Sequence, residues 1–273
     1  MDRRGARASR FACGVFRNSL AWHLCQQRLF GPVLISRIDS VSSTTSTNDD
    51  VAAMARSGAE EGYWLRADRQ SGGRGRLGRN WQSPVGNLYA STLIPLRPDD
   101  PPAPSLAFVA AVAAHKVLLP LAGERALQLK WPNDLLLDGG KCTGILLERE
   151  GDVVVLGMGV NLAHAPDIPG RKTASFADVG TVAEPAALMP ELASAFAAML
   201  ERWRADRLPA ILQEWEARAH PRGAELSVSL GPEEKLVGRF GGLAADGALL
   251  LELADGSLRE IRAADVEIVR ERS

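Results

Sequence analysis

The fold is most clearly encoded by residues 141–161, which read KCTGILLEREGDVVVLGMGVN. Two runs of aliphatic and β-branched residues, Lys141–Glu148 and Val153–Met158, lie on either side of the turn Glu150-Gly151-Asp152. Strand-forming residues that flank a short glycine-containing turn are typical of a β-hairpin. We therefore expect these two runs to pair as antiparallel strands.

Strands and helices alternate outward from this hairpin. A helix is expected to begin near Thr47, which forms a capping-box pattern with Asp50, and to end at Gly58. The other expected helices are Ser105–Leu119, Glu184–Arg204 and Leu208–Ala219. The other expected strands are Val33–Ile38, Tyr63–Asp68, Leu88–Ile94, Leu127–Trp131 and Leu135–Leu137. This mixture predicts a protein of the α+β class, with a mixed α/β main domain.

A break in the chain at Pro221-Arg222-Gly223 separates this domain from a smaller one. Residues 224–270 contain only short β-like runs separated by glycines, which predicts a small β-barrel. The expected domains are therefore residues 31–221 and 222–273. Residues 1–30 carry six arginines against one acid, so we expect a flexible basic arm or a start codon assigned too early. This arm is too short for a helix-turn-helix domain with its own core.

Composition excludes several classes of function. The formal net charge is −1, so no overall field draws the protein to nucleic acid or to an anionic membrane. Three widely spaced cysteines without a CxxC pair argue against a disulfide framework or a zinc site and suit the cytoplasm. The longest apolar run, Leu106–Ala114, is far shorter than the roughly 20 residues of a membrane span.

The most distinctive segment is the loop QSGGRGRLGR at residues 70–79, which Trp81 follows shortly after. Its glycines disfavour a regular helix or strand, and its three arginines are donors suited to phosphate oxygens. Such a loop can close over a polyanion. A non-specific RNA-binding segment of the Arg/Gly type is the competing interpretation. The chain contains no Walker phosphate loop.

Four other segments carry polar groups at strand or helix ends. Lys130 and Asp134 lie in KWPND, where a lysine could pair with phosphate and a carboxylate could hold Mg²⁺. Lys141 begins an apolar strand. Asn161 ends another strand after two glycines, and this asparagine could be a metal or phosphate ligand or only a turn former. Hydroxyls at residues 42–47 precede a helix and suit a ureido group or a carboxylate. Each segment alone also has a purely structural explanation as a turn, a cap or a surface ion pair.

Together and in this order, the motifs resemble those of the biotin–protein ligase family. They are Ser46-Thr47-Asn48, the 70–79 loop, Lys130-Trp131-Pro132-Asn133-Asp134, Lys141-x-x-Gly144-Ile145-Leu146-x-Glu148 and Gly157-x-Gly159-Val160-Asn161. The match spans roughly residues 33–165. The resemblance implies a mixed α/β catalytic domain of the biotin/lipoate ligase type followed by a small SH3-like β-barrel.

The resemblance also implies residue roles. Biotin would contact Ser46, Thr47, Asn48, Gln70 and Lys141. The loop closing over biotin and its activated form would contain Arg74, Gly75, Arg76 and Arg79. The nucleotide and Mg²⁺ site would be lined by Trp81, Lys130, Asn133, Asp134 and Asn161, with Asp134 and Asn161 as the metal ligands. Lys141, Arg76 and Arg79 would be the catalytic cations.

The implied activity uses ATP to form biotinyl-5′-AMP and transfers biotin to a lysine of a biotin carboxyl carrier domain. Both steps develop negative charge on oxygen, which cations stabilise, and no Ser/His/Asp or Cys/His nucleophile arrangement is apparent. We expect a cytoplasmic enzyme that does not bind DNA or membranes, and a weak homodimer is left open. The alternatives are a lipoate–protein ligase or related acyltransferase, and an RNA-binding protein.

Overall fold

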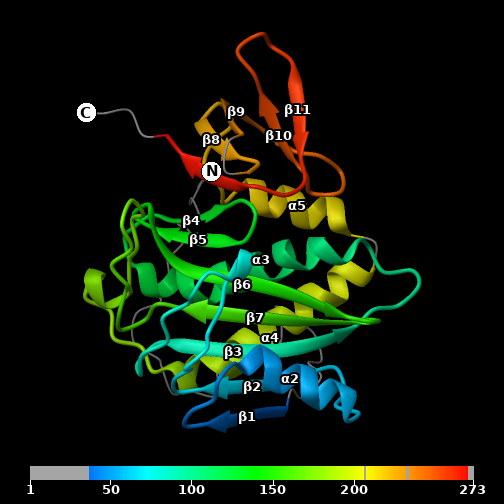
Figure 1. Cartoon of the computed structure of the whole chain (residues 1–273), viewed down its shortest axis with the longest axis vertical. Coiled ribbons are helices and arrows are strands. Elements are labelled where there is room, and N and C mark those ends of the chain that lie inside the picture. Colours follow the sequence, from blue (N-terminus) through cyan, green and yellow to red (C-terminus); the bar gives the residue numbers. More distant parts are fainter. Residues whose placement is uncertain (1–36, 206, 232–233, 270–273) are drawn as a thin grey trace, which may run out of the picture. The chain divides into compact units, whose positions relative to one another are not determined.

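The computed structural model describes residues 37–205, 207–231 and 234–269, all within one compact unit, Leu34–Ser273 (Figure 1). The expected basic arm at residues 1–30 lies outside this range. Most of the strand expected at Val33–Ile38 also lies outside the described range. The structure describes its last two residues and their continuation as β1 (Arg37–Val41).

The main domain is built on a seven-stranded sheet in the order β1-β2-β3-β7-β6-β5-β4. After β1 the strands are β2 (Tyr63–Ala67), β3 (Leu88–Pro95), β4 (Leu127–Lys130), β5 (Asp134–Leu137), β6 (Gly140–Glu150) and β7 (Val153–Val160). Only β1 and β2 pair in parallel; the other neighbours are antiparallel. The expected hairpin is confirmed, with Glu150 opposite Val153 and Leu147 opposite Leu156.

Alternating side chains separate the two faces of this sheet. Trp64 of β2 faces the main core, whereas Tyr63 and Leu65 face the other side. On the core face, α3 (Leu106–Ala122) packs against β4, β5 and β6, and α4 (Pro185–Arg204) and α5 (Leu208–Glu216) pack against α3. The other face carries α2 (Thr47–Arg56), which packs on β2, β3 and β7 (Figure 1). Because α2 is short, part of this second face is available for a site.

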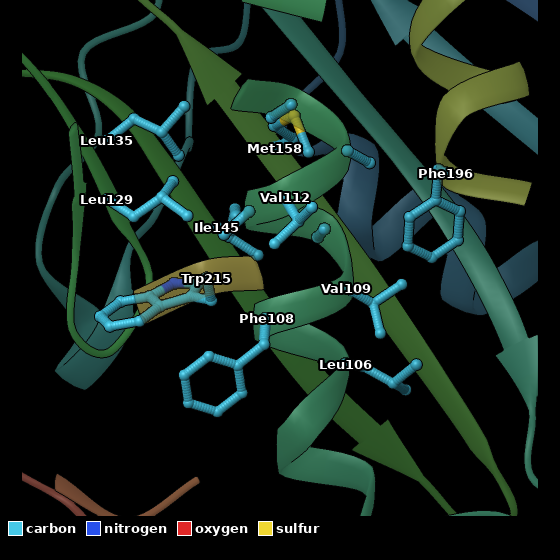
Figure 2. Packing of buried hydrophobic residues seen from close by; sticks show 14 of the residues in the cluster. Leu106, Phe108, Val109, Val112, Leu129, Leu135, Ile145, Met158, Phe196 and Trp215 are labelled. Atoms are coloured by element: carbon cyan, nitrogen blue, oxygen red, sulfur yellow. The ribbon is translucent and has the colours of Figure 1, made fainter. Parts of the chain in front are cut away.

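Helix α3 is the centre of the core. Figure 2 shows its Phe108 and Val112 among side chains of the sheet and of α5, including Trp215. The rings of Phe108 and Trp215 meet edge to face, with their centroids 5.5 Å apart. The stretch Ala103–Ala122 is long and apolar enough to cross a membrane, so the run is longer than the sequence estimate of nine residues. However, 78% of its most apolar 18-residue window is buried inside the protein, as expected for a core helix.

The start of α2 differs by one residue from the expected capping pattern. Ser46, not Thr47, is the N-cap residue, and its hydroxyl accepts a hydrogen bond from the Asp49 backbone N–H at 3.4 Å. The pattern S/T-x-x-D/E occurs twice in overlapping register here, at Ser46–Asp49 and at Thr47–Asp50. Thr47 is instead buried, and it turns its hydroxyl toward Gln70 and Ser91.

The C-terminal domain is an antiparallel sheet of five strands in the order β11-β10-β9-β8-β12. They are β8 (Glu225–Ser229), β9 (Lys235–Leu243), β10 (Leu249–Glu252), β11 (Leu258–Ile261) and β12 (Asp265–Ile268). Three short 3₁₀ helices, Arg76–Gly78, Ala103–Ser105 and Ala177–Val179, complete the described elements. The expected order of a mixed α/β domain followed by a small β domain is confirmed, while the boundaries at 31 and 222 stay predictions.

The two domains share packing at the β9–β10 turn. The indole N–H of Trp131, which lies in the main domain, donates a hydrogen bond to the Gly247 carbonyl at 3.1 Å. Gly247 has a φ of +87°, and a Cβ added there would collide with the ring of Phe108. This turn therefore packs directly against the main core.

We predict that Gly247→Ala destabilises the protein more than Gly256→Ala. Both glycines occupy turns with positive φ, which costs an alanine about 1–2 kcal/mol. Only at Gly247 must a core side chain also move, because nothing lies within 4 Å of a Cβ at Gly256. Urea denaturation of both variants measures the difference, and equal losses of unfolding free energy would contradict this account.

Candidate active site

A cavity of about 900 Å³ lies on the second face of the sheet, beside the N-terminus of α2. Every residue that the sequence predicted for the site lines this cavity. They are Ser46, Thr47, Asn48, Gln70, Arg74, Gly75, Arg76, Arg79, Trp81, Lys130, Asn133, Asp134, Lys141 and Asn161. Segments that are separated by up to about a hundred residues in sequence are thus brought to one place.

Glycines of the central hairpin create the space for this cavity. On the cavity face, Gly144 pairs with Gly159, and Gly157 pairs with Leu146. A Cβ at Gly144 or Gly159 would come within 3 Å of the Trp81 ring, and one at Gly157 would collide with the Asn48 amide. The missing side chains therefore let Trp81 and Asn48 lie directly on the sheet.

One end of the cavity is a neutral hydrogen-bonding pocket. The Gln70 Oε1 accepts hydrogen bonds from the backbone N–H and the hydroxyl of Thr47, at 2.8 and 3.1 Å. The Gln70 amide N–H donates to the Ser83 hydroxyl at 3.1 Å. Ser91 connects the Thr47 hydroxyl to the Asn48 Oδ1, at 2.7 and 2.6 Å. These contacts hold both donors and acceptors at the wall of the cavity, as a small polar ligand requires.

The other end is cationic. The Lys141 Nζ lies 2.6 Å from the Asp134 Oδ1 and 5.4 Å from the centre of the Trp81 ring. The Lys130 Nζ lies 3.8 Å from the other oxygen of Asp134, and burial lowers the pKa of this lysine. The contact between Lys141 and Asp134 is an ion pair without the directionality of a hydrogen bond. One carboxylate thus serves two ammonium groups, which leaves a net positive charge.

The three arginines of the 70–79 loop have different surroundings. Arg74 pairs with Asp49 and Glu148, and Arg79 donates to Asp265 of β12 at 2.7 Å. Arg76 donates to the Asn133 Oδ1 and to the Ala264 carbonyl, at 3.5 and 3.3 Å. Within the described part of the chain, no carboxylate lies at ion-pair distance from Arg76.

Burial lowers the pKa of Arg76, against the opposing influence of Asp265 and Asp134. A desolvated guanidinium without an ion-pair partner favours the binding of an anion. The expectation that all three arginines can bind a polyanion therefore applies best to Arg76. The RNA-binding interpretation loses support because two of the three guanidinium groups are already paired within the protein.

The described residues could supply Mg²⁺ with only a few protein ligands. Asp134 is one carboxylate facing the cavity, and Mg²⁺ commonly uses one or two carboxylates together with substrate phosphates and water. The Asn161 amide N–H donates to the carbonyls of Lys141 and Ala174, at 3.3 and 3.2 Å, so it positions the Lys141 backbone. Across the described ranges, no group of three His, Cys, Asp or Glu side chains could hold a metal.

Several residues of the cavity were not predicted from the sequence. Arg171 and Lys172 belong to a loop whose residue Thr173 forms a parallel β-bridge with Lys141. Asp265 and Glu267 reach the cavity from the C-terminal domain. His220 is also at its wall, and burial lowers its pKa to about 4. Neither ring nitrogen has a hydrogen-bond partner among the residues that the structure describes. None of these residues lies in a recognisable motif, so no sequence signal marked them.

We predict that Gly159→Ala displaces Trp81 and weakens binding of biotin, the ligand expected from the sequence. Overpacking typically costs 1–3 kcal/mol, which corresponds to roughly 5- to 150-fold in affinity. Isothermal titration calorimetry with biotin measures the loss. Gly231→Ala is the matched control, because its added Cβ would meet nothing within 4 Å and its φ is unstrained. Unchanged affinity in Gly159→Ala would contradict the assigned role of this glycine.

Comparison with known proteins agrees with the geometry. Residues 40–163 match the model of the biotin/lipoate A/B protein ligase family, and residues 227–269 match the biotin protein ligase C-terminal domain. The biotin–[acetyl-CoA-carboxylase] ligase of Paracoccus denitrificans is 39% identical over 229 residues, which cover 77% of this chain and 92% of the relative. The ligase of the same name from Mycobacterium tuberculosis is 32% identical, over 86% and 90% of the two chains.

A solved structure shows the same fold. The biotin protein ligase from Aquifex aeolicus in complex with biotin and ATP superimposes with a TM-score of 0.75 and 25% sequence identity. The match covers 85% of this chain and 99% of that one. The chain therefore belongs to the biotin protein ligase family.

Proposed function

We propose that this protein is an ATP-dependent ligase that joins biotin to a lysine of a biotin carboxyl carrier domain. The observation that carries the proposal is one cavity that combines a neutral hydrogen-bonding pocket with a desolvated cationic end. Biotin has a neutral ureido ring at one end and a carboxylate at the other, so its polarity matches that of the cavity.

The neutral pocket favours biotin over lipoate. A ureido group both donates and accepts hydrogen bonds, which suits Thr47, Gln70 and their hydroxyl neighbours. The dithiolane ring of lipoate forms only weak hydrogen bonds through sulfur. A site built to hydrogen-bond a ligand discriminates strongly against an analogue that leaves its buried polar groups unpaired.

The cationic end suits the chemistry of adenylation. In the first step an oxygen of the biotin carboxylate attacks the α-phosphorus of ATP; the bond to the β-phosphate oxygen breaks, and pyrophosphate leaves. In the second step the acceptor amine attacks the acyl carbon, AMP leaves, and the amine loses a proton. Arg76, Lys130 and Lys141 line the cavity and would stabilise the charge on oxygen in both steps.

The Lys141 ammonium lies over the ring of Trp81, and we assign it the biotin carboxylate and then the phosphate of the mixed anhydride. Neither step forms a covalent bond between biotin and the enzyme. Cys142 is fully buried, and burial raises its pKa to about 12, so its thiol is not a nucleophile.

Mg²⁺ would be held by Asp134 together with phosphate oxygens, and Asn161 stays a predicted second ligand. The ion would neutralise charge on the phosphates. The proposed location is the cytoplasm. The absence of DNA binding and a weak homodimer stay predictions.

The test is pyrophosphate release by the purified protein with ATP, Mg²⁺ and either biotin or lipoate. Release with biotin and not with lipoate is the expected result. Release only with lipoate would retain the two-step chemistry and overturn the substrate. Release with neither would overturn the proposed function, and salt-sensitive RNA binding would then be measured.

We predict that Arg76→Ala and Lys141→Ala each lower the rate of biotin-dependent pyrophosphate release by roughly a hundredfold or more, as expected for loss of one preorganised charge donor. Both side chains are partly exposed at the cavity, so the fold should remain intact. Arg149→Ala is the matched control, since this exposed arginine of β6 lies outside the cavity. Normal rates in either site variant would refute its assigned role.

A further inference from the structure

Arg74 has no hydrogen-bond donor left for a ligand. A guanidinium group has five N–H donors, and all five meet acceptors of the protein. Nε and one Nη2 hydrogen meet the two oxygens of Glu148, at 2.9 and 3.0 Å. The other Nη2 hydrogen and one Nη1 hydrogen meet the two oxygens of Asp49, at 2.5 and 2.8 Å. The remaining Nη1 hydrogen is donated to the Ser46 hydroxyl oxygen, which lies 3.4 Å from Nη1; all these distances join nitrogen and oxygen atoms.

Glu148 connects this arginine to the neutral pocket. Its Oε2 also accepts a hydrogen bond from the Asn48 amide at 2.6 Å, and the Asn48 Oδ1 accepts from Ser91. Glu148 and Asp49 do not line the cavity, whereas Arg74 and Asn48 do. Glu148 therefore acts on the cavity wall from behind and does not touch the ligand.

The two halves of the 70–79 loop differ in how they are attached. In the first half, the backbone N–H groups of Ser71 and Gly72 donate to the carbonyls of Thr44 and Thr45, at 3.0 and 2.8 Å. A Cβ at Gly72 or Gly73 would come within 3 Å of neighbouring atoms, so this half is closely packed.

The second half is attached more loosely. The Gly75 N–H donates a hydrogen bond to the Arg79 carbonyl within this half, and Leu77 is 82% exposed with a φ of +58°. A Cβ at Gly75 would meet only one atom, at 3.8 Å, and one at Gly78 would meet nothing within 4 Å. In the described structure, the side chains of Arg76 and Arg79 connect this half to the C-terminal domain.

We propose that Glu148 is a positioning residue that, with Asp49, clamps Arg74 and so divides the loop into a fixed half, residues 70–74, and a closing half, residues 75–80. The fixed half completes the biotin pocket before any ligand binds. The closing half, which contains Arg76, responds to the phosphates. This inference rests on the proposed function for its ligand, but the clamp itself is a property of the unliganded protein.

The clamp couples three elements that are distant in sequence: the N-terminus of α2, strand β6 and the loop. The guanidinium and the Glu148 carboxylate are each about one-third exposed. An isolated ion pair of that exposure contributes little, whereas two bidentate carboxylates on one guanidinium form a directional network. The pKa of Arg74 is raised, chiefly by its hydrogen bonds to Asp49 and then to Glu148.

The experiment compares Glu148→Gln and Glu148→Leu with Glu150→Gln. Glu150 is the matched control, because it lies on the same strand as Glu148 and, like Glu148, pairs with an arginine. Its partner is Arg56 of α2, and Glu150 does not line the cavity. Hydrogen–deuterium exchange at single-residue resolution is measured on the unliganded proteins. Exchange at Ser71 and Gly72 should accelerate at least about tenfold in Glu148→Leu, less in Glu148→Gln, and not in Glu150→Gln.

Steady-state kinetics give the second readout. The KM for biotin should rise by roughly tenfold in Glu148→Leu, while the KM for ATP stays near that of the wild type. Unchanged exchange and an unchanged biotin KM in both Glu148 variants would overturn the proposal. If Glu148→Leu does not fold, Glu148→Gln, which keeps the shape of the side chain, decides it. If the wild type releases no pyrophosphate with biotin, the proposed function fails, and the exchange data still decide the clamp.

Discussion

The site depends on one constraint: the cavity face of the central hairpin must lack side chains at Gly144, Gly157 and Gly159. The hairpin itself is stabilised by apolar residues on its other face, such as Ile145 opposite Met158, which pack against α3. Because side chains alternate along a strand, one face can be a dense core while the other is nearly bare. Trp81 and Asn48 then rest on backbone, and the cavity extends between them.

Charge is distributed unequally around this bare face. Arg74 and Arg79 are neutralised by carboxylates of the protein, so they build structure. Arg76 and Lys130 are desolvated with too few counter-charges, so they favour an anionic ligand. Residues of one type in one short loop thus divide between architecture and binding. Their neighbours in the fold, not their spacing, decide which role each has.

The C-terminal domain contributes directly to the cavity. Asp265 pairs with Arg79 at 2.7 Å and lies 3.9 Å from Arg171, so one carboxylate of β12 contacts two loops of the main domain. Trp131 and the β9–β10 turn pack the two domains together on the core side. The small β domain is therefore part of the active-site wall.

The sequence by itself predicted most of the strands and helices and a set of residues that line the cavity. Hairpin, helices and glycine-rich loop follow from local patterns of apolar residues and turn formers, and the order of five motifs indicated the family. Tertiary structure alone decided which arginines have carboxylate partners, that Ser46 caps α2, and that Asp265 and His220 line the cavity. Those contacts join residues up to nearly two hundred positions apart, such as Arg79 and Asp265, and no local pattern in a single sequence encodes such a distance.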